Sequence, residues 1–247
     1  MRLTVLGSGD AFSGCGCNAG YAVDGRLLVD AGAPVHVMLR RAGLDMAAVD
    51  TVLITHFHAD HTFMLPILLG ALMVTPGRSP TLVMAGPVGL REYVDHLVGA
   101  GYGPQMRDLV RERVGPSYIV LQDGSDEHIN GYRVRAHAVV HSTGPSLAYS
   151  VSDGSGATLG FSGDSTVCAG LERVITESDL VVCECTHWEA PIPGHLWREE
   201  VAALIAAHPS TRFLVSHLTE RRQLAGAVTA EDLLSLDVVG GGRSPRP

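Results

Sequence analysis

Short apolar runs recur along the chain and predict a protein rich in β-strands. They are dominated by β-branched and aliphatic residues and are bounded by Gly, Pro, Asp or Asn, as strands usually are. The predicted strands are Leu3–Leu6, Tyr21–Val23, Leu27–Val29, Thr51–Ile54, Thr81–Ala85, Tyr118–Leu121, Tyr132–Val140, Leu147–Val151, Thr158–Phe161, Leu180–Glu184 and Phe213–Ser216.

Apolar residues at helical spacing separate many of these strands. They predict helices over Pro34–Ala42, Thr62–Met73, Val88–Val98, Cys168–Thr176, Arg198–Ala207 and Ala230–Leu236. Strands come first and then alternate with helices, which favours sheets covered by helices on their outer faces. No linker-like stretch divides the middle, so we expect one domain over residues 1–237. The Gly- and Pro-rich end predicts a loose tail over 238–247.

Charge composition excludes several functions. The 247 residues carry 26 acidic and 18 basic side chains, a net charge of −8, and every basic residue is arginine. Without lysine there is no Schiff-base or pyridoxal-phosphate lysine and no P-loop lysine. The negative balance argues against nonspecific binding to nucleic acid.

The apolar stretches are too short to predict a membrane span. The longest, from Phe63 to Val74, contains Pro66 and Gly70, whereas a spanning helix needs about 20 apolar residues. Five cysteines suggest no disulfide framework. We therefore expect a cytoplasmic protein that does not bind membranes. Cys15 and Cys17 form a Cys-x-Cys pair, which is a weak metal or redox signal without a second pair.

The strongest chemical signal is a histidine-rich segment after the fourth predicted strand. Residues 51–61 read TVLITHFHADH, so a buried strand leads directly into His56, His58, Asp60 and His61. Imidazole suits zinc and similar metals, and carboxylates help to hold divalent ions. His56 and His58 can point at one spot just past the strand end, and Asp60 and His61 at a second spot nearby. The segment predicts a metal site.

This segment resembles the His-x-His-x-Asp-His signature of the metallo-β-lactamase-fold hydrolases. Three later elements of that pattern have counterparts here, each following a predicted strand: His141 in VVHS, Asp164 in FSGDS and His217 in FLVSHL. The resemblance therefore extends over nearly the whole chain, in the expected order.

The resemblance implies a four-layer αββα sandwich with a two-metal site at one edge. His56, His58 and His141 would hold one ion, Asp60, His61 and His217 the other, and Asp164 would bridge them. Two such ions can share a water that is deprotonated to hydroxide near neutral pH and acts as the nucleophile. Asp60 could orient this hydroxide. Zinc is the metal expected from the ligand types, while manganese or iron would suit the same ligands.

The segments between the ligands resemble one branch of this superfamily, that of tRNase Z and the cyclic-nucleotide phosphodiesterases. His141-Ser142 is followed by a Pro and a strand containing Tyr, without the second histidine of the lactonases and thioesterases. The start, LGSGDAF at residues 6–12, also resembles this branch. Glu184 in CECT and His195 in GHL resemble its Glu and His elements, although Cys183, Cys185 and Trp197 depart from the usual residues. A histidine polarised by a carboxylate can protonate a departing alkoxide, so His195 is the candidate acid and Glu184 its partner.

The resemblance leaves the substrate open, and the chain argues against tRNA. His141 and Asp164 are joined only by two predicted strands and a Gly-rich turn, with no room for the arm by which tRNase Z clamps tRNA. Arg221 and Arg222 follow His217, where a phosphate could lie. We expect a phosphodiesterase acting on a small phosphodiester such as a cyclic nucleotide. The alternatives are a lactone, ester or thioester hydrolase with the same metal site, and a non-catalytic metal-binding protein. Relatives in this branch are often dimers, so a homodimer is a candidate assembly.

Overall fold

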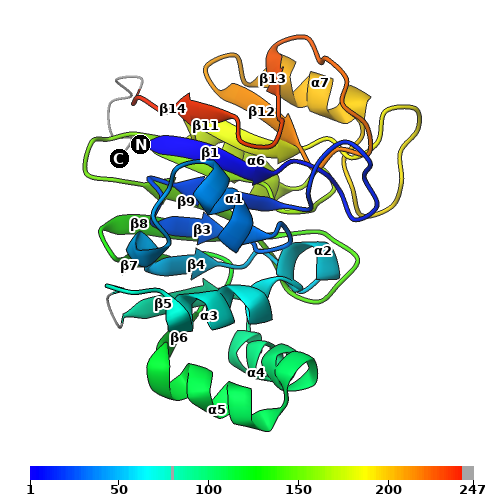
Figure 1. The fold of residues 1–247 in the computed structure, drawn as a ribbon. Helices are drawn as coiled ribbons and strands as arrows, with labels where there is room; N and C mark the ends of the chain where they lie inside the picture. Colours follow the sequence, from blue (N-terminus) through cyan, green and yellow to red (C-terminus); the bar gives the residue numbers. More distant parts are fainter. Residues whose placement is uncertain (79–80, 241–247) are drawn as a thin grey trace.

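The computed structural model describes residues 1–78 and 81–240, which form two sheets with helices on their outer faces (Figure 1). One seven-stranded sheet has the order β14-β1-β2-β3-β4-β5-β6, and the other has the order β13-β12-β11-β10-β9-β8-β7. The strands of the first sheet are β1 (Arg2–Gly7), β2 (Gly20–Val23), β3 (Leu27–Val29), β4 (Thr51–Leu53), β5 (Leu82–Gly86), β6 (Pro116–Val120) and β14 (Ser235–Asp237). Those of the second are β7 (Asp126–Ile129), β8 (Tyr132–Val139), β9 (Ser146–Ser152), β10 (Thr158–Phe161), β11 (Leu180–Glu184), β12 (Arg212–Ser216) and β13 (Ala227–Thr229).

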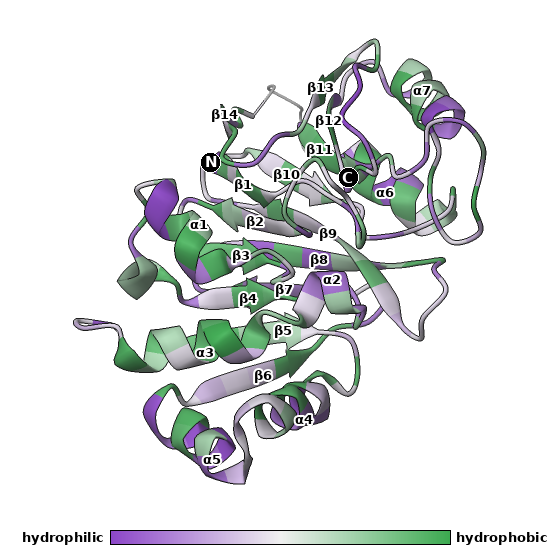
Figure 2. Cartoon of the chain, turned by 45° about the vertical axis from the view of Figure 1, so that its right-hand side comes forward, coloured by the Kyte–Doolittle hydropathy of each residue, from purple (hydrophilic) through white to green (hydrophobic). Residues whose placement is uncertain are grey.

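The helices pack on the two outer faces of this sandwich. They are α1 (Val35–Arg41), α2 (Ala59–Thr62), α3 (Leu65–Val74), α4 (Leu90–Tyr102), α5 (Pro104–Arg113), α6 (Ala169–Glu177) and α7 (Arg198–Ala207), with a 3-10 helix η1 at Met46–Ala48. Buried residues of α1, α3 and α4 share one apolar cluster with the first sheet, and those of α6 and α7 share another with the second. Figure 2 shows that α3 is apolar along almost its whole length.

Alternation along the strands builds these layers. On β3, Leu27 and Val29 belong to the cluster between the sheets, whereas Leu28 faces the helices. On β11, Leu180 and Val182 point between the sheets, and Val181 points toward the helices. Successive side chains of a strand point to opposite faces, so strands that are apolar on both faces are covered on both sides.

The direction of the strands gathers the functional segments at one edge of the sandwich. In the first sheet β3, β4 and β5 are parallel, and in the second β10, β11 and β12 are parallel. Strand β8 reaches β10 through two antiparallel pairings, so it runs in the same direction as β10. Across the sheets, Leu147 N donates to Thr55 O at 3.0 Å, and Tyr149 Oη donates to Ile54 O at 2.6 Å. These bonds join the ligand-bearing edges of the two sheets.

Most predicted strands and helices are confirmed within a few residues, but two predictions need correction. The helix predicted over Ala230–Leu236 is wrong: Leu233 has a φ of +71°, and the chain then forms β14, which pairs with β1. The helix predicted over Thr62–Met73 is divided into α2 and α3, and α3 begins with Leu65-Pro66. The short strands β7 and β13 were not predicted. The part of the predicted tail from residue 241 onward lies outside the described residues.

Within residues 1–78 and 81–240, no helix has the length and apolar character needed to cross a membrane.

Candidate metal centre

The segment between β4 and α2 carries four of the predicted site residues. It leaves β4 after Leu53 and enters α2 at Ala59, so His56 and His58 lie in the connecting loop while Asp60 and His61 lie in the first helical turn. His56, Asp60 and His61 are buried, and His58 is half-buried. One short segment therefore supplies ligands to two neighbouring points.

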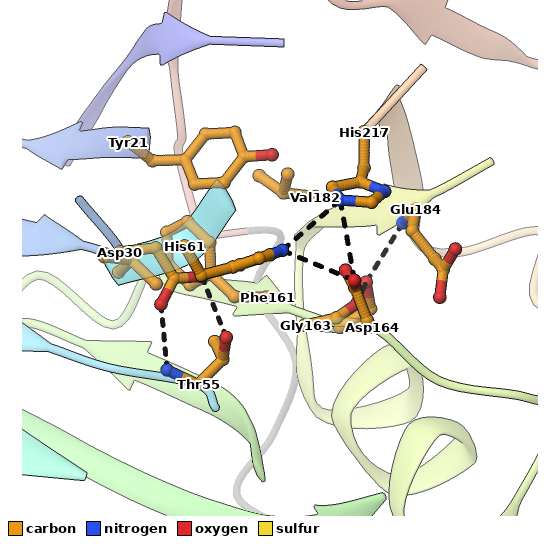
Figure 3. Close-up of a pocket in the computed structure, with 12 residues that line it drawn as sticks. Tyr21, Asp30, Thr55, His61, Phe161, Gly163, Asp164, Val182, Glu184 and His217 are labelled. Atoms are coloured by element: carbon orange, nitrogen blue, oxygen red, sulfur yellow. Dashed lines mark hydrogen bonds and ion pairs between the residues drawn. The ribbon is translucent and has the colours of Figure 1, made fainter. Parts of the chain in front are cut away.

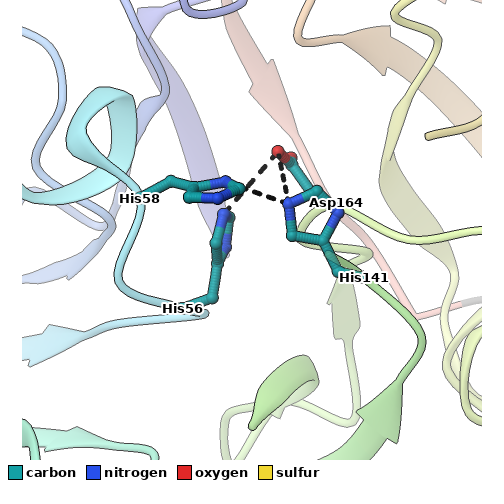
Figure 4. A group of neighbouring side chains, drawn as sticks. All are labelled: His56, His58, His141 and Asp164. Carbon is teal, nitrogen blue, oxygen red and sulfur yellow. Dashed lines mark hydrogen bonds and ion pairs between the residues drawn. The ribbon is translucent and has the colours of Figure 1, made fainter. Parts of the chain in front are cut away.

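The first group of ligand atoms comes from His56, His58, His141 and Asp164 (Figure 4). One atom of each lies within 4.8 Å of the others, which is a spacing that could hold a metal ion. His58 Nδ1 is 3.0 Å from His141 Nε2, and His56 Nε2 is 3.7 Å from Asp164 Oδ2. His56 and His58 follow β4 of the first sheet, whereas His141 follows β8 and Asp164 follows β10 of the second, so both sheets contribute.

The second group comes from Asp60, His61, Asp164 and His217, with the same spacing. His217 Nε2 is 3.1 Å from Asp60 Oδ2 and 3.3 Å from His61 Nε2. Asp164 Oδ2 is 3.3 Å from His61 Nε2 and 3.5 Å from His217 Nε2 (Figure 3). Asp164 therefore belongs to both groups, and the structure brings together all seven residues predicted as ligands.

Outward hydrogen bonds fix which nitrogen of three of these histidines carries the proton. His61 Nδ1 is 2.8 Å from the Asp30 carboxylate, and His141 Nδ1 is 2.7 Å from the carbonyl oxygen of Gly194. His217 Nδ1 is 2.9 Å from Thr186 Oγ1, which gives its own proton to a carboxylate. A proton on each Nδ1 leaves the inward Nε2 with a lone pair. In the neutral rings the inward atoms are therefore acceptors facing acceptors. Burial alone would keep these rings neutral, but where no cation is bound the charge of Asp164 raises the pKa of His61 and His217.

That arrangement fits a cation at each group. In the neutral rings, the 3.3 Å contact between His61 Nε2 and His217 Nε2 brings two lone pairs together. His56 Nε2 and Asp164 Oδ2 are buried and have no hydrogen-bond partner among the described residues. Leaving such an atom unpaired costs about 1–3 kcal/mol, and a bound divalent ion would supply the missing partner. Imidazole and carboxylate donors are those that zinc and its neighbours prefer.

Asp30, which the sequence analysis missed, supports the second group from behind. It follows β3 directly, lies in the left-handed region with a φ of +58°, and is buried. Its carboxylate accepts from Thr55 N at 2.9 Å and Thr55 Oγ1 at 2.8 Å in addition to His61. Two residues later, a Cβ at Gly32 would lie 1.5 Å from Asp60 O, so glycine is required for the close approach of the two segments. A carboxylate ending an apolar strand was the available signal.

Glu184 and His195 form a pair beside both groups. His195 Nδ1 is 3.1 Å from Glu184 Oε2 and 3.8 Å from Asp164 Oδ2. Glu184 is buried at the end of β11 and also accepts from Ser165 N and Thr186 Oγ1, each at 2.5 Å. The His195 ring stacks at 5.7 Å on the ring of His217. The pair predicted from sequence is therefore in contact, and its histidine keeps 21% of its side-chain surface exposed.

Burial and charge act on these groups in opposite directions. Burial lowers the pKa of His56 to about 2, so this imidazole stays neutral. Burial alone would lower the pKa of His195, but the hydrogen bond to Glu184 and the charge of Glu184 raise it above its usual value. Burial would raise the pKa of Asp60, yet the hydrogen bond from His217 and the charge of His61 hold it at about 2. The site thus places a neutral ligand and a carboxylate beside an imidazole whose pKa is raised.

The remaining sequence candidates lie around the site without joining the ligand groups. Arg221 donates to the carbonyl oxygen of Cys15 at 2.7 Å, and Arg222 pairs with Glu189 and Glu220, each at 2.6 Å. Both arginines therefore hold surface loops together. Burial and Asp232 raise the pKa of the Cys17 thiol to about 11, so it is not a reactive thiolate.

Comparison with known proteins places this site in a family. The sequence profile described as anti-Pycsar protein Apyc1 matches residues 1–229. The chain belongs to the anti-Pycsar protein Apyc1 family. The match includes every predicted ligand from His56 to His217.

More distant relatives share the fold. Ribonuclease Z of Methanosarcina acetivorans is 22% identical over 309 residues, covering 96% of this chain and 98% of the relative. The short form of human tRNase Z superposes with a TM-score of 0.76 at 23% identity, covering 96% of this chain and 99% of that one. Yeast PDE1 superposes with a TM-score of 0.71 at 13% identity, covering 96% and 99%. The predicted αββα metallo-β-lactamase sandwich and the tRNase Z and phosphodiesterase branch are confirmed, and the chain is a metal-dependent hydrolase.

Proposed function

We propose that this protein is a phosphodiesterase that hydrolyses a small phosphodiester, such as a cyclic nucleotide, with two divalent metal ions, zinc being the expected metal. The observation that carries the proposal is the contact of His195 with Glu184 directly beside two ligand groups that share Asp164. A metal site alone would serve many hydrolases. An acid placed next to it serves a reaction whose leaving group needs a proton.

The ligand roles follow the two groups. His56, His58 and His141 would hold one ion, and Asp60, His61 and His217 the other, with Asp164 common to both. Ions bound there would lower the pKa of a water, so that it is deprotonated near neutral pH. They would also supply positive charge that stabilises the transition state. Asp60 stays a carboxylate beside His217 and would orient the attacking water.

His195 would protonate the departing alkoxide. Its Nδ1 donates to Glu184 Oε2, which leaves Nε2 to carry the second proton of the imidazolium. The charge of Glu184 favours that protonated form. Glu184 itself is held by Ser165 N and Thr186 Oγ1, so the acid has a fixed orientation.

A small substrate is supported by the connection between His141 and Asp164. Strands β9 and β10 form a plain antiparallel pair, joined by a tight turn at 153–157. The alignment with the Methanosarcina ribonuclease Z runs over 309 residues, more than the 247 of this chain, so the relative carries insertions that this chain lacks. A net charge of −8 also argues against nonspecific attraction to the phosphates of tRNA.

A substrate panel tests the proposal. Metal-loaded protein is incubated with bis(p-nitrophenyl) phosphate, cyclic nucleotides, a precursor tRNA and a set of lactones and thioesters. We expect turnover of the phosphodiesters and none of the precursor tRNA. Turnover confined to lactones or thioesters would contradict the proposal and support the carboxylic ester hydrolase instead.

A further inference from the structure

The segment that carries four ligand residues leaves the first sheet after β4 and before it enters α2. Residues 54–58 belong to no strand or helix, so the carbonyl oxygens of Phe57 and His58 are not part of a sheet ladder. The His58 carbonyl accepts from His61 N at 3.1 Å and from Thr62 Oγ1 at 2.7 Å. The Phe57 carbonyl accepts from a side chain of another element, the Tyr93 hydroxyl of α4, at 2.8 Å.

Tyr93 contacts this segment in two further ways. Its hydroxyl oxygen is 2.9 Å from Thr62 Oγ1, so two hydroxyl groups lie together and serve the two neighbouring carbonyls. Its ring stacks on the ring of Phe57 with the centroids 4.6 Å apart and the planes inclined by 16°. Phe57 lies between His56 and His58 in sequence, and Thr62 follows His61. The contacts therefore hold the segment beside His56, its first ligand residue, and beside His61, its last.

The fold makes Tyr93 a rigid support. It lies in the first turn of α4, a thirteen-residue helix whose Leu90, Val94 and Val98 are buried against the first sheet. The turn before α4 contains Gly89 with a φ of +91°, and a Cβ there would lie 3.9 Å from Phe57 Cε2. The helix is thus anchored through its own buried face and can fix the position of the ligand segment.

We propose that Tyr93 is a positioning residue that holds the segment from His56 to Thr62 in its metal-binding geometry and so tightens the binding of the ion held by His56, His58 and His141. The inference rests on the ligand set of the proposed function. His58 is half-buried, and it depends most on its backbone for placement, because less packing constrains its side chain. Loss of the Tyr93 hydroxyl leaves the Phe57 carbonyl without this partner and lets the segment shift.

Metal competition measures this role without reference to catalysis. Tyr93→Phe keeps the stacked ring and removes only the hydroxyl, and Thr62→Val removes the second hydroxyl at nearly constant volume. Partners that orient metal ligands contribute about 10–100-fold in affinity. Because Tyr93 acts through the backbone, we expect about a tenfold weaker affinity for one of the two zinc ions, titrated against a chromophoric chelator. The control is Tyr102→Phe at the exposed end of the same helix, which should bind both ions as the wild type does.

The two variants also test each other. Since both hydroxyls belong to one network, the double variant should lose less affinity than the sum of the single losses. Wild-type affinity for both ions in Tyr93→Phe would overturn the inference and leave the proposed function standing. If Tyr93→Phe failed to fold, Thr62→Val would carry the same test. A wild-type protein that bound no divalent ion would overturn the inference and the proposed function together.

Discussion

His141 Nδ1 donates a hydrogen bond of 2.7 Å to the carbonyl oxygen of Gly194, the residue immediately before His195. The segment that carries the candidate acid is therefore attached to a member of the first ligand group. Gly194 has a φ of +89°, and a Cβ there would lie 3.4 Å from His141 Nδ1. The placement of the acid and the orientation of a ligand thus depend on the same peptide unit.

Gly194→Ala should reduce turnover by displacing that unit. Alanine at this φ costs about 1–3 kcal/mol, which the segment can avoid by moving His195 away from Glu184. We expect kcat for an alkyl phosphodiester, whose leaving group needs the acid, to fall about tenfold or more, a loss that corresponds to the same energy range. Gly131→Ala is the matched control, because Gly131 has a φ of +92° and open space around it. Equal losses in both variants would refute the link to the site.

His195→Ala tests the acid through the leaving group. General acid catalysis contributes about 10²–10⁴-fold, and it matters most when the leaving alcohol is weakly acidic. We expect that loss of kcat with an alkyl phosphodiester and a much smaller loss with bis(p-nitrophenyl) phosphate, at unchanged metal content. The control is His208→Ala, which removes another histidine paired with a carboxylate, Glu172. The same loss for both substrates would contradict an acid role.

Asp30→Asn should weaken metal binding without unfolding the chain. Asparagine tolerates a positive φ, so the backbone at +58° is kept while the charge facing His61 is lost. We expect about a 10–100-fold lower affinity for one ion, measured by chelator competition. Asp24→Asn provides the control, since Asp24 has a φ of +51° and bonds Tyr132 instead of a ligand. Unchanged affinity in Asp30→Asn would show that this carboxylate does not orient His61.

Metal removal should destabilise the fold around the site. Without ions, the buried His56 Nε2 and Asp164 Oδ2 have no partner among the described residues, and ligands that bind only the native state stabilise it. We expect dialysis against a chelator to lower Tm by several degrees and zinc to restore it. A Tm that does not respond to zinc would contradict the assigned ligand groups.

The sequence predicted the layers and the ligands because both leave local signals. Strand periodicity predicted β3 and β11, and the residues from His56 to His61 indicated a metal site by themselves. The supporting residues carry no local signal that identifies their partners. Asp30 and Gly194 acquire their roles from partners 31 and 53 positions away, and Tyr93 from partners 31 and 36 positions away. Nothing in one sequence reveals such distant pairs.

The helix that was wrongly predicted over Ala230–Leu236 has a comparable cause. The pattern from Ala230 to Leu236 suits a helix locally, but Leu236 pairs with Leu3 at the edge of the first sheet. The buried β1 has room for another partner there, and tertiary pairing prevails over local periodicity for so short a segment.

The central claim is tested most directly by titrating metal-free protein with zinc while following hydrolysis of bis(p-nitrophenyl) phosphate. The two ligand groups that share Asp164 predict that activity rises until two equivalents of zinc per chain are bound and then reaches a plateau. A plateau at one equivalent, or hydrolysis that does not depend on added metal, would contradict a two-metal phosphodiesterase.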